Sequence, residues 1–140
     1  MTLKQNREGE GAVPHAINLR AVPGVFSVAR LSPDATLPAW FDGPGFSAMV
    51  RSDDELTLVC LQDRVPTNVE AEPNWRCFRS LGPIPFNATG ILQSLIQPIS
   101  EQGIGVFVLC TFDGEHILVP EKDWDRAARL LEEAGHVFVS

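Results

Sequence analysis

One stretch of the sequence, Gly103 to Asp123, constrains the fold of this chain more than any other. It begins with an apolar run from Val106 to Cys110, which is long enough for a strand with both faces covered. A second apolar run, Ile117 to Val119, follows after a polar turn that contains Asp113 and Gly114. An Asp-Gly pair between two apolar runs is typical of a tight connection, so we predict a β-hairpin here.

A similar pattern occurs sixty positions earlier, from Gly43 to Asp63. The two stretches align without a gap, and the identical positions are glycines, acidic turn residues and the end of the second strand. The identical pairs are Gly43/Gly103, Gly45/Gly105, Asp53/Asp113, Glu55/Glu115, Leu58/Leu118, Val59/Val119 and Asp63/Asp123. Because backbone geometry is most demanding at such positions, we interpret the match as an internal duplication, with equivalent hairpins at 46–60 and 106–119. The alternative is that two unrelated hairpins share their turn chemistry.

The second half of the chain predicts a complete order of elements. Residues 75–81 are expected to form a strand, and apolar residues at helical spacing over 91–99 predict a helix capped by Asn87 or Thr89. After the hairpin, an apolar stripe over 124–134 predicts a second helix that stops at Gly135, before a last strand. Strand, helix, strand, strand, helix, strand is the ferredoxin-like (βαββαβ) order, with both helices on one face of an antiparallel sheet.

We divide the chain into an N-terminal arm (residues 1–20), a first, degenerate domain (21–70) and a second domain (71–140). Glycine and proline in the arm disfavour regular structure. In the first domain, Pro38 leaves room for only a short helix before the hairpin. The predicted fold class is therefore α+β, with tandem ferredoxin-like domains that share antiparallel sheets.

Net charge and cysteine content limit the classes of partner and site that we expect. A net charge of -7 argues against nucleic acid or an anionic membrane surface as partner. Cys60, Cys77 and Cys110 lie in apolar runs and lack metal-site spacing, so we expect reduced core residues in a cytoplasmic protein. No apolar run approaches the roughly 20 residues of a membrane span, and the polar N-terminus lacks the apolar stretch of a signal peptide.

The segment TFDGEHILVPEKD, with GPIPFNATGIL before it, resembles the ACT domain family. Within that family, residues 24–140 are similar to bacterial tandem-ACT proteins related to aspartate kinase regulatory domains and to the CASTOR-type cytosolic arginine sensor. The resemblance is stronger in the second repeat than in the first. It implies a regulatory or sensory protein that binds a small ligand, usually an amino acid, at an interface between ACT units, and it implies no cofactor or metal.

The resemblance also implies which residues line the ligand. These are the turn Gly103, Ile104 and Gly105, then Thr111 and Phe112, with an acid just beyond, where Glu115 stands and Asp113 is the nearby alternative. Asn87, at the start of the predicted helix, marks backbone N–H groups that suit a carboxylate. Simpler roles remain open for each: glycines can permit a turn, Asn87 can be a cap, and turn acids can be solvated.

Two other classes of function remain open. The chain lacks a GxSxG motif, a Walker-type glycine loop and an HExxH motif, so we expect no catalytic residues and no enzyme. A pure assembly module would use the same fold without binding any small molecule. In either case we expect a homodimer or higher oligomer, because pairing across a twofold axis protects exposed sheet edges. A protein partner of unspecified kind would receive the signal.

Overall fold

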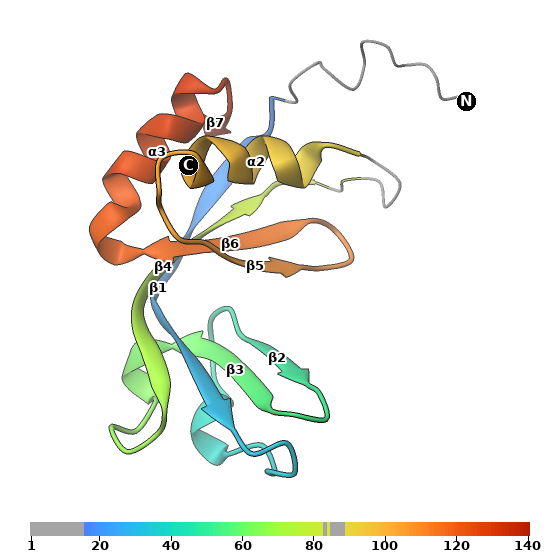
Figure 1. Cartoon of the computed structure of the whole chain (residues 1–140), viewed down its shortest axis with the longest axis vertical. Helices are drawn as coiled ribbons and strands as arrows, with labels where there is room; N and C mark the ends of the chain where they lie inside the picture. Colours follow the sequence, from blue (N-terminus) through green and yellow to red (C-terminus); the bar gives the residue numbers. More distant parts are fainter. Residues whose placement is uncertain (1–15, 83, 85–88) are drawn as a thin grey trace. The chain divides into compact units, whose positions relative to one another are not determined.

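The computed structural model describes residues 16–82, 84 and 89–140, and these divide into two compact units. The described part of unit 1 comprises residues 16–21 and the chain from Phe78 onward, and unit 2 comprises Val22–Cys77. Two long strands, β1 (Asn18–Leu31) and β4 (Ala71–Ser80), contribute residues to both units. Each unit also has a hairpin of its own (Figure 1).

Unit 2 is an antiparallel sheet with single 3-10 turns and, among its described residues, no α-helix. The strands β2 (Ala48–Arg51) and β3 (Leu56–Leu61) form its hairpin, and β3 pairs antiparallel with β1. The strand order is β2-β3-β1-β4. The 3-10 turns are η1 (Ala39–Phe41), before the hairpin, and η2 (Gln62–Arg64), after it.

The shortness of η1 follows from the residues on either side. Pro38 occupies its N-cap in an extended conformation, and an Asp-Gly-Pro sequence follows Phe41. Trp40 and Phe41 pack against a small buried cluster that contains Leu56 and Leu58. The predicted short helix is confirmed as this turn, which covers the sheet with a few large side chains.

Unit 1 carries both α-helices of the described residues and confirms the predicted order of elements in the second half of the chain. After β4 come α2 (Ile91–Ser100), the hairpin of β5 (Phe107–Cys110) and β6 (Glu115–Pro120), η3 (Glu121–Asp123), α3 (Trp124–Glu133) and β7 (Val137–Phe138). Both helices lie on one side of the sheet (Figure 1). They bury one core with it, which includes Leu95, Ile117 and Leu131 at 0 to 1% exposure.

The sheet of unit 1 contains a strand that the prediction left out. Asn18 and Leu19, at the start of β1, pair in parallel with β7. On the other side, the backbone N–H of Leu81 donates to the carbonyl of Asn18 at 2.9 Å. The start of β1 therefore lies between β4 and β7. The predicted arm, residues 1–20, thus ends in a strand, and residues 1–15 are outside the described structure.

The two hairpins have the same register, but at a different offset from the one predicted. Ala48 pairs with Val59 in one hairpin, and Phe107 pairs with Leu118 in the other. Corresponding residues are therefore 59 positions apart, and the gapless alignment at sixty is wrong by one residue here. The identical side chains led to this error, because Glu55 matches Glu115 in type whereas its structural counterpart is Gly114.

α2 continues through Pro98 because another residue supplies the missing donor. In a regular helix, the N–H of residue 98 would bond to the carbonyl of Ser94, and proline has no N–H. His136 Nε2 lies 2.9 Å from that carbonyl oxygen, while His136 Nδ1 accepts a hydrogen bond from the N–H of Ile17 at 3.1 Å. Because Nδ1 accepts, Nε2 is the donor. The buried His136 therefore ties α2 to the start of β1.

α3 ends at the predicted stop, and its half-buried first residue packs against the core. Gly135 has a φ of 102°, and the N–H of His136 donates to the carbonyl of Leu131 at 3.0 Å. Trp124 packs with Phe78 and Phe138, with ring centroids 6.4 and 6.2 Å away. These contacts hold α3 against the sheet on the face that the helices share.

Candidate ligand site

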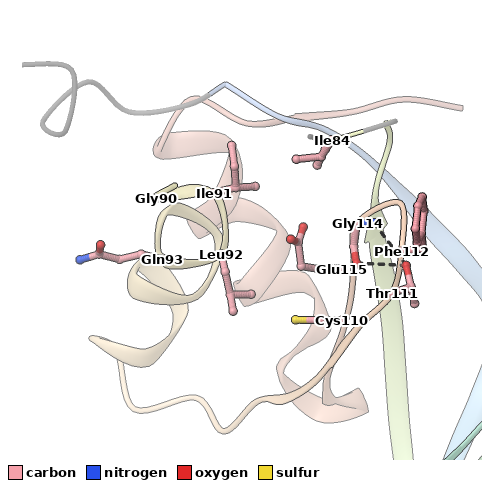
Figure 2. Close-up of a pocket in the computed structure, with 10 residues that line it drawn as sticks. All are labelled: Ile84, Gly90, Ile91, Leu92, Gln93, Cys110, Thr111, Phe112, Gly114 and Glu115. Atoms are coloured by element: carbon pink, nitrogen blue, oxygen red, sulfur yellow. Dashed lines mark hydrogen bonds between the residues drawn. The ribbon is translucent and has the colours of Figure 1, made fainter. Parts of the chain in front are cut away.

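Unit 1 contains a pocket of about 320 Å³ between the first turn of α2 and the β5–β6 hairpin (Figure 2). This volume is at the lower end of the range for small-molecule sites. Ile84, Ile91 and Leu92 give it apolar walls, while Cys110 and Glu115 line it from the hairpin. The pocket therefore combines an apolar surface with a single carboxylate.

Ser80 positions the carboxylate of Glu115. The Ser80 side chain, on a residue with 3% exposure, donates from Oγ to Glu115 Oε1 at 3.0 Å and accepts from the Glu115 N–H at 2.9 Å. The Glu115 side chain points into the space between α2 and the hairpin (Figure 2). No other described residue donates to Oε2, so this oxygen remains available to a ligand.

Gly114 allows this approach because it has no side chain. A Cβ at Gly114 would lie 2.5 Å from Ser80 Oγ, closer than real contacts allow. The turn itself is closed by Thr111, whose N–H donates to the carbonyl of Gly114 at 2.7 Å and whose Oγ1 donates to it at 3.1 Å. Its hydroxyl also accepts from the Gly114 N–H at 3.3 Å. Thr111 therefore shapes the turn and has its hydroxyl already engaged.

The opposite wall of the pocket is the N-terminus of α2. Gly90 is the N-cap, with a φ of 80°, and as a glycine it supplies no side-chain cap to the helix. The N–H groups of Ile91, Leu92 and Gln93 therefore have no acceptor within the helix, and the positive end of the helix dipole is at this point. The predicted cap at Thr89 is wrong, because the glycine after it occupies that position.

Comparison with known proteins identifies the family. Residues 70–133 match the ACT domain family, and residues 24–68 match a separate family of N-terminal domains. The crystal structure of protein Atu0741 from Agobacterium tumefaciens is 47% identical, with a TM-score of 0.85, over 89% of this chain and 93% of that one. The chain belongs to the family of this Agobacterium protein and carries an ACT domain. No curated protein matches it.

The fold of this ACT-domain protein is also similar to that of aspartate kinases. Aspartate kinase from Clostridium acetobutylicum is 16% identical, with a TM-score of 0.63, over 84% of this chain and 34% of that one. The regulatory subunit of aspartate kinase from Thermus thermophilus is 11% identical, with a TM-score of 0.57, over 79% of this chain and 93% of that one. At these identities the likeness shows the fold alone.

The ACT domain brings three of the predicted site residues to the pocket: Thr111, Phe112 and Glu115. The Phe112 ring points away from the pocket in Figure 2, and the residue is 82% exposed. Asp113 belongs to the same turn, where its carbonyl accepts from the N–H of Ile84 at 3.1 Å, but it does not line the pocket. Asn87 lies outside the described residues.

The predicted glycine turn is not part of this pocket. Gly103, Ile104 and Gly105 follow the C-terminus of α2, whereas the pocket is at its N-terminus. A helix of this length separates its ends by about 15 Å. Ile104 is 3% exposed and belongs to the core, and Gly103 has a φ of 77°, which suits the turn that leaves the helix. A ligand role for these three residues stays a prediction, and this pocket does not support it.

Several residues of the pocket were not predicted from the sequence. Ser80 lies within the predicted strand over 75–81, and no sequence signal indicates that it contacts Glu115. Cys110 was expected in the core, and that prediction is wrong: it is exposed, whereas Cys60 and Cys77 are buried. Its sulfur points toward the pocket from the last position of an edge strand (Figure 2).

His116 lies next to Glu115 in the sequence but on the other face of β6, because side chains alternate along a strand. Burial lowers the pKa of His116, and the Arg79 guanidinium lowers it further. Within the described parts of the chain, no group of His, Cys, Asp and Glu side chains is arranged to hold a metal ion. No helix there is long and apolar enough to cross a membrane.

Proposed function

We propose that this protein is a regulatory sensor that binds a free amino acid in the pocket between α2 and the β5–β6 hairpin. One observation carries the proposal: a fixed carboxylate, Glu115, and the uncapped N-terminus of α2 line the same pocket. The ACT domain is a regulatory module, and the fold likeness to the regulatory subunit of an aspartate kinase supports this class of function over catalysis.

The two walls of the pocket suit the two charged groups of a free amino acid. The ligand carboxylate would accept hydrogen bonds from the free N–H groups of the first turn of α2, at the positive end of the helix dipole. The ligand ammonium would donate to Glu115 Oε2, while Ser80 holds Oε1. Hydrogen bonds to charged groups contribute about 1.5 to 3 kcal/mol each. A ligand that lacks either group would lose one of these contacts.

We further propose that the chain is a tandem ACT protein, in which unit 2 is a degenerate repeat. The equal register of the two hairpins supports this, as do η1, which precedes its hairpin as α2 does in unit 1, and η2, which follows its hairpin directly as η3 does in unit 1. As in tandem-ACT sensors, a homodimer would bring ACT units together at the site. A cytoplasmic location, with a protein partner that receives the signal and without nucleic acid or membrane contact, completes the proposal.

A thermal-shift screen against the amino acids tests the proposed function. A ligand at a hundred times its dissociation constant adds about 2.7 kcal/mol of stability, which is a shift of several degrees for a domain of this size. Alkylation of Cys110 locates the site, because the other two cysteines are buried. A ligand in this pocket should slow the reaction. If no amino acid shifts the melting temperature or protects Cys110, the protein acts as an assembly module.

Sedimentation velocity tests the proposed dimer separately. A homodimer at micromolar concentration, with or without ligand, is the expected result. A protein that sediments only as a monomer, with and without a ligand that protects Cys110, would leave the pocket intact as a site but contradict its position at an interface between copies.

A further inference from the structure

We propose that the ligand is an amino acid with an uncharged aliphatic side chain. This rests on the proposed function and adds the ligand class. The pocket has one charged group among its described lining residues, Glu115, and a free amino acid needs that group for its ammonium. Once Glu115 is used, no charged partner remains for the side chain of the ligand.

The remaining walls are suited to an apolar side chain. Ile84, Ile91 and Leu92 present aliphatic carbon, and Cys110 presents a thiol. The one hydroxyl on the hairpin side, that of Thr111, is held within its own turn. The amide of Gln93 points away from the pocket (Figure 2). An acidic ligand side chain would be desolvated here without a cation, which is costly.

The geometry of Glu115 also disfavours a guanidinium. Arginine binds a carboxylate best through two parallel hydrogen bonds, one to each oxygen. Ser80 already donates to Oε1, so a guanidinium that bonds to both oxygens would have to share Oε1 with the Ser80 hydroxyl. A primary ammonium is a compact group that can satisfy one oxygen and needs no paired geometry. The site therefore fits the α-ammonium of a ligand better than the side chain of arginine.

Calorimetric titration of the full chain with a series of amino acids tests this inference. Alanine, 2-aminobutyrate and norvaline add one methylene at a time, and each should bind about fourfold more tightly than the one before until the pocket is filled. Aspartate, lysine and arginine should each bind at least tenfold more weakly than norvaline.

A variant pair makes the test specific to the pocket. Cys110→Asp adds a second carboxylate to the wall and should raise the affinity for lysine relative to norvaline by tenfold or more. Cys110→Ser is the matched control and should keep the wild-type order.

The outcomes separate the two proposals. If a charged amino acid binds the wild type more tightly than every aliphatic one, the ligand class is wrong and the proposed function stands. If no amino acid binds, the proposed function fails and this inference fails with it. A ratio of lysine to norvaline affinity that does not rise in Cys110→Asp would place the ligand side chain elsewhere and overturn the argument from these walls.

Discussion

The two units use the same kind of hairpin but cover it differently. Both hairpins have the same register, and both pass into a 3-10 turn, η2 or η3, directly after the second strand. In unit 1 the ten-residue helix α2 precedes the hairpin and the ten-residue helix α3 follows η3, whereas in unit 2 the single turns η1 and η2 flank the hairpin. The hairpin geometry therefore does not depend on the helices that pack on it.

The difference explains why this candidate site forms in unit 1. The pocket needs an α-helix whose free N–H groups lie across from a carboxylate, and a three-residue 3-10 turn does not offer a comparable N-terminus. Pro38 and the Asp-Gly-Pro sequence limit η1, whereas Ile91 to Ser100 has an apolar residue on one face at every turn. A few residues before each hairpin thus decide which unit has a site.

The largest effect should come from truncating a buried side chain of α2, the helix whose place before the hairpin is taken in unit 2 by the turn η1. Leu95 is 0% exposed, so Leu95→Ala should reduce the free energy of unfolding by about 2 to 5 kcal/mol through lost burial and a cavity. Leu37 in unit 2 is 49% exposed, and Leu37→Ala should change the free energy of unfolding by no more than about 0.5 kcal/mol. Urea unfolding measures both, and equal losses would contradict the assignment of the core.

The next effect concerns the support of α2 by His136. His136→Phe leaves the carbonyl of Ser94 and the N–H of Ile17 without their partner, at about 1 to 2 kcal/mol each, so we expect a loss of about 2 to 4 kcal/mol. In a Pro98→Ala background, the new N–H can bond to Ser94, and the same substitution should cost about 1 kcal/mol less. If His136→Phe destabilises the protein equally with and without Pro98→Ala, His136 does not replace the donor that Pro98 lacks.

A smaller effect distinguishes the turns of the two hairpins. Gly114→Ala places a methyl group against Ser80 Oγ, so we expect a loss of about 1 to 3 kcal/mol. Glu55, its counterpart in the other hairpin, has a 41% exposed side chain, and Glu55→Ala should stay within about 0.5 kcal/mol. Ser80→Ala should recover part of the loss in Gly114→Ala. Denaturation of the double variant decides this, and no recovery would remove Ser80 as the cause.

The smallest expected effect is a difference in pH dependence between equivalent positions. The pKa of His116 is lowered in the folded protein by burial and by Arg79, so the unfolded state binds more protons at mildly acidic pH. Its contribution to stability is therefore present above the unfolded pKa of about 6.5 and is lost as the pH falls toward the lower folded pKa.

The residue that corresponds to His116 in unit 2 is Thr57, so the variant His116→Thr copies the other hairpin. Urea unfolding at pH 7.5 and 5.5 should show a smaller loss of stability on acidification in the variant than in the wild type. An equal loss in both proteins would assign the pH dependence to other groups.

The sequence was most informative where apolar spacing and turn residues agree. The spacing over 91–99, the stop at Gly135 and the Asp-Gly turn each have a local physical cause, and the structure confirms them. The start of β1 was missed, although Ile17, Leu19 and Ala21 alternate with polar residues as in a strand. Its partner β7 is more than a hundred residues away, and no local pattern indicates such a pairing.

The candidate site could be predicted only in part for the same reason. The resemblance to the ACT domain family predicts Glu115 and Thr111, and the structure brings both to the pocket. Ser80 reaches Glu115 from another strand, and a 35-residue separation leaves no spacing signal. The glycine turn attracted attention by its residue type, but a ten-residue helix separates it from the pocket. Residue type alone therefore overestimates sites at turns.

Calorimetric titration of two glutamate variants tests the central claim that unit 1 binds an amino acid through Glu115. Glu115→Gln keeps the shape and removes the charge, and it should weaken the binding of the best amino acid by about tenfold or more. Glu55→Gln makes the same change in the hairpin of unit 2, which is flanked by the 3-10 turns η1 and η2, and it should leave the affinity unchanged. The account of this site is wrong if both variants bind the amino acid as tightly as the wild type. It is also wrong if Glu55→Gln weakens the binding more than Glu115→Gln does.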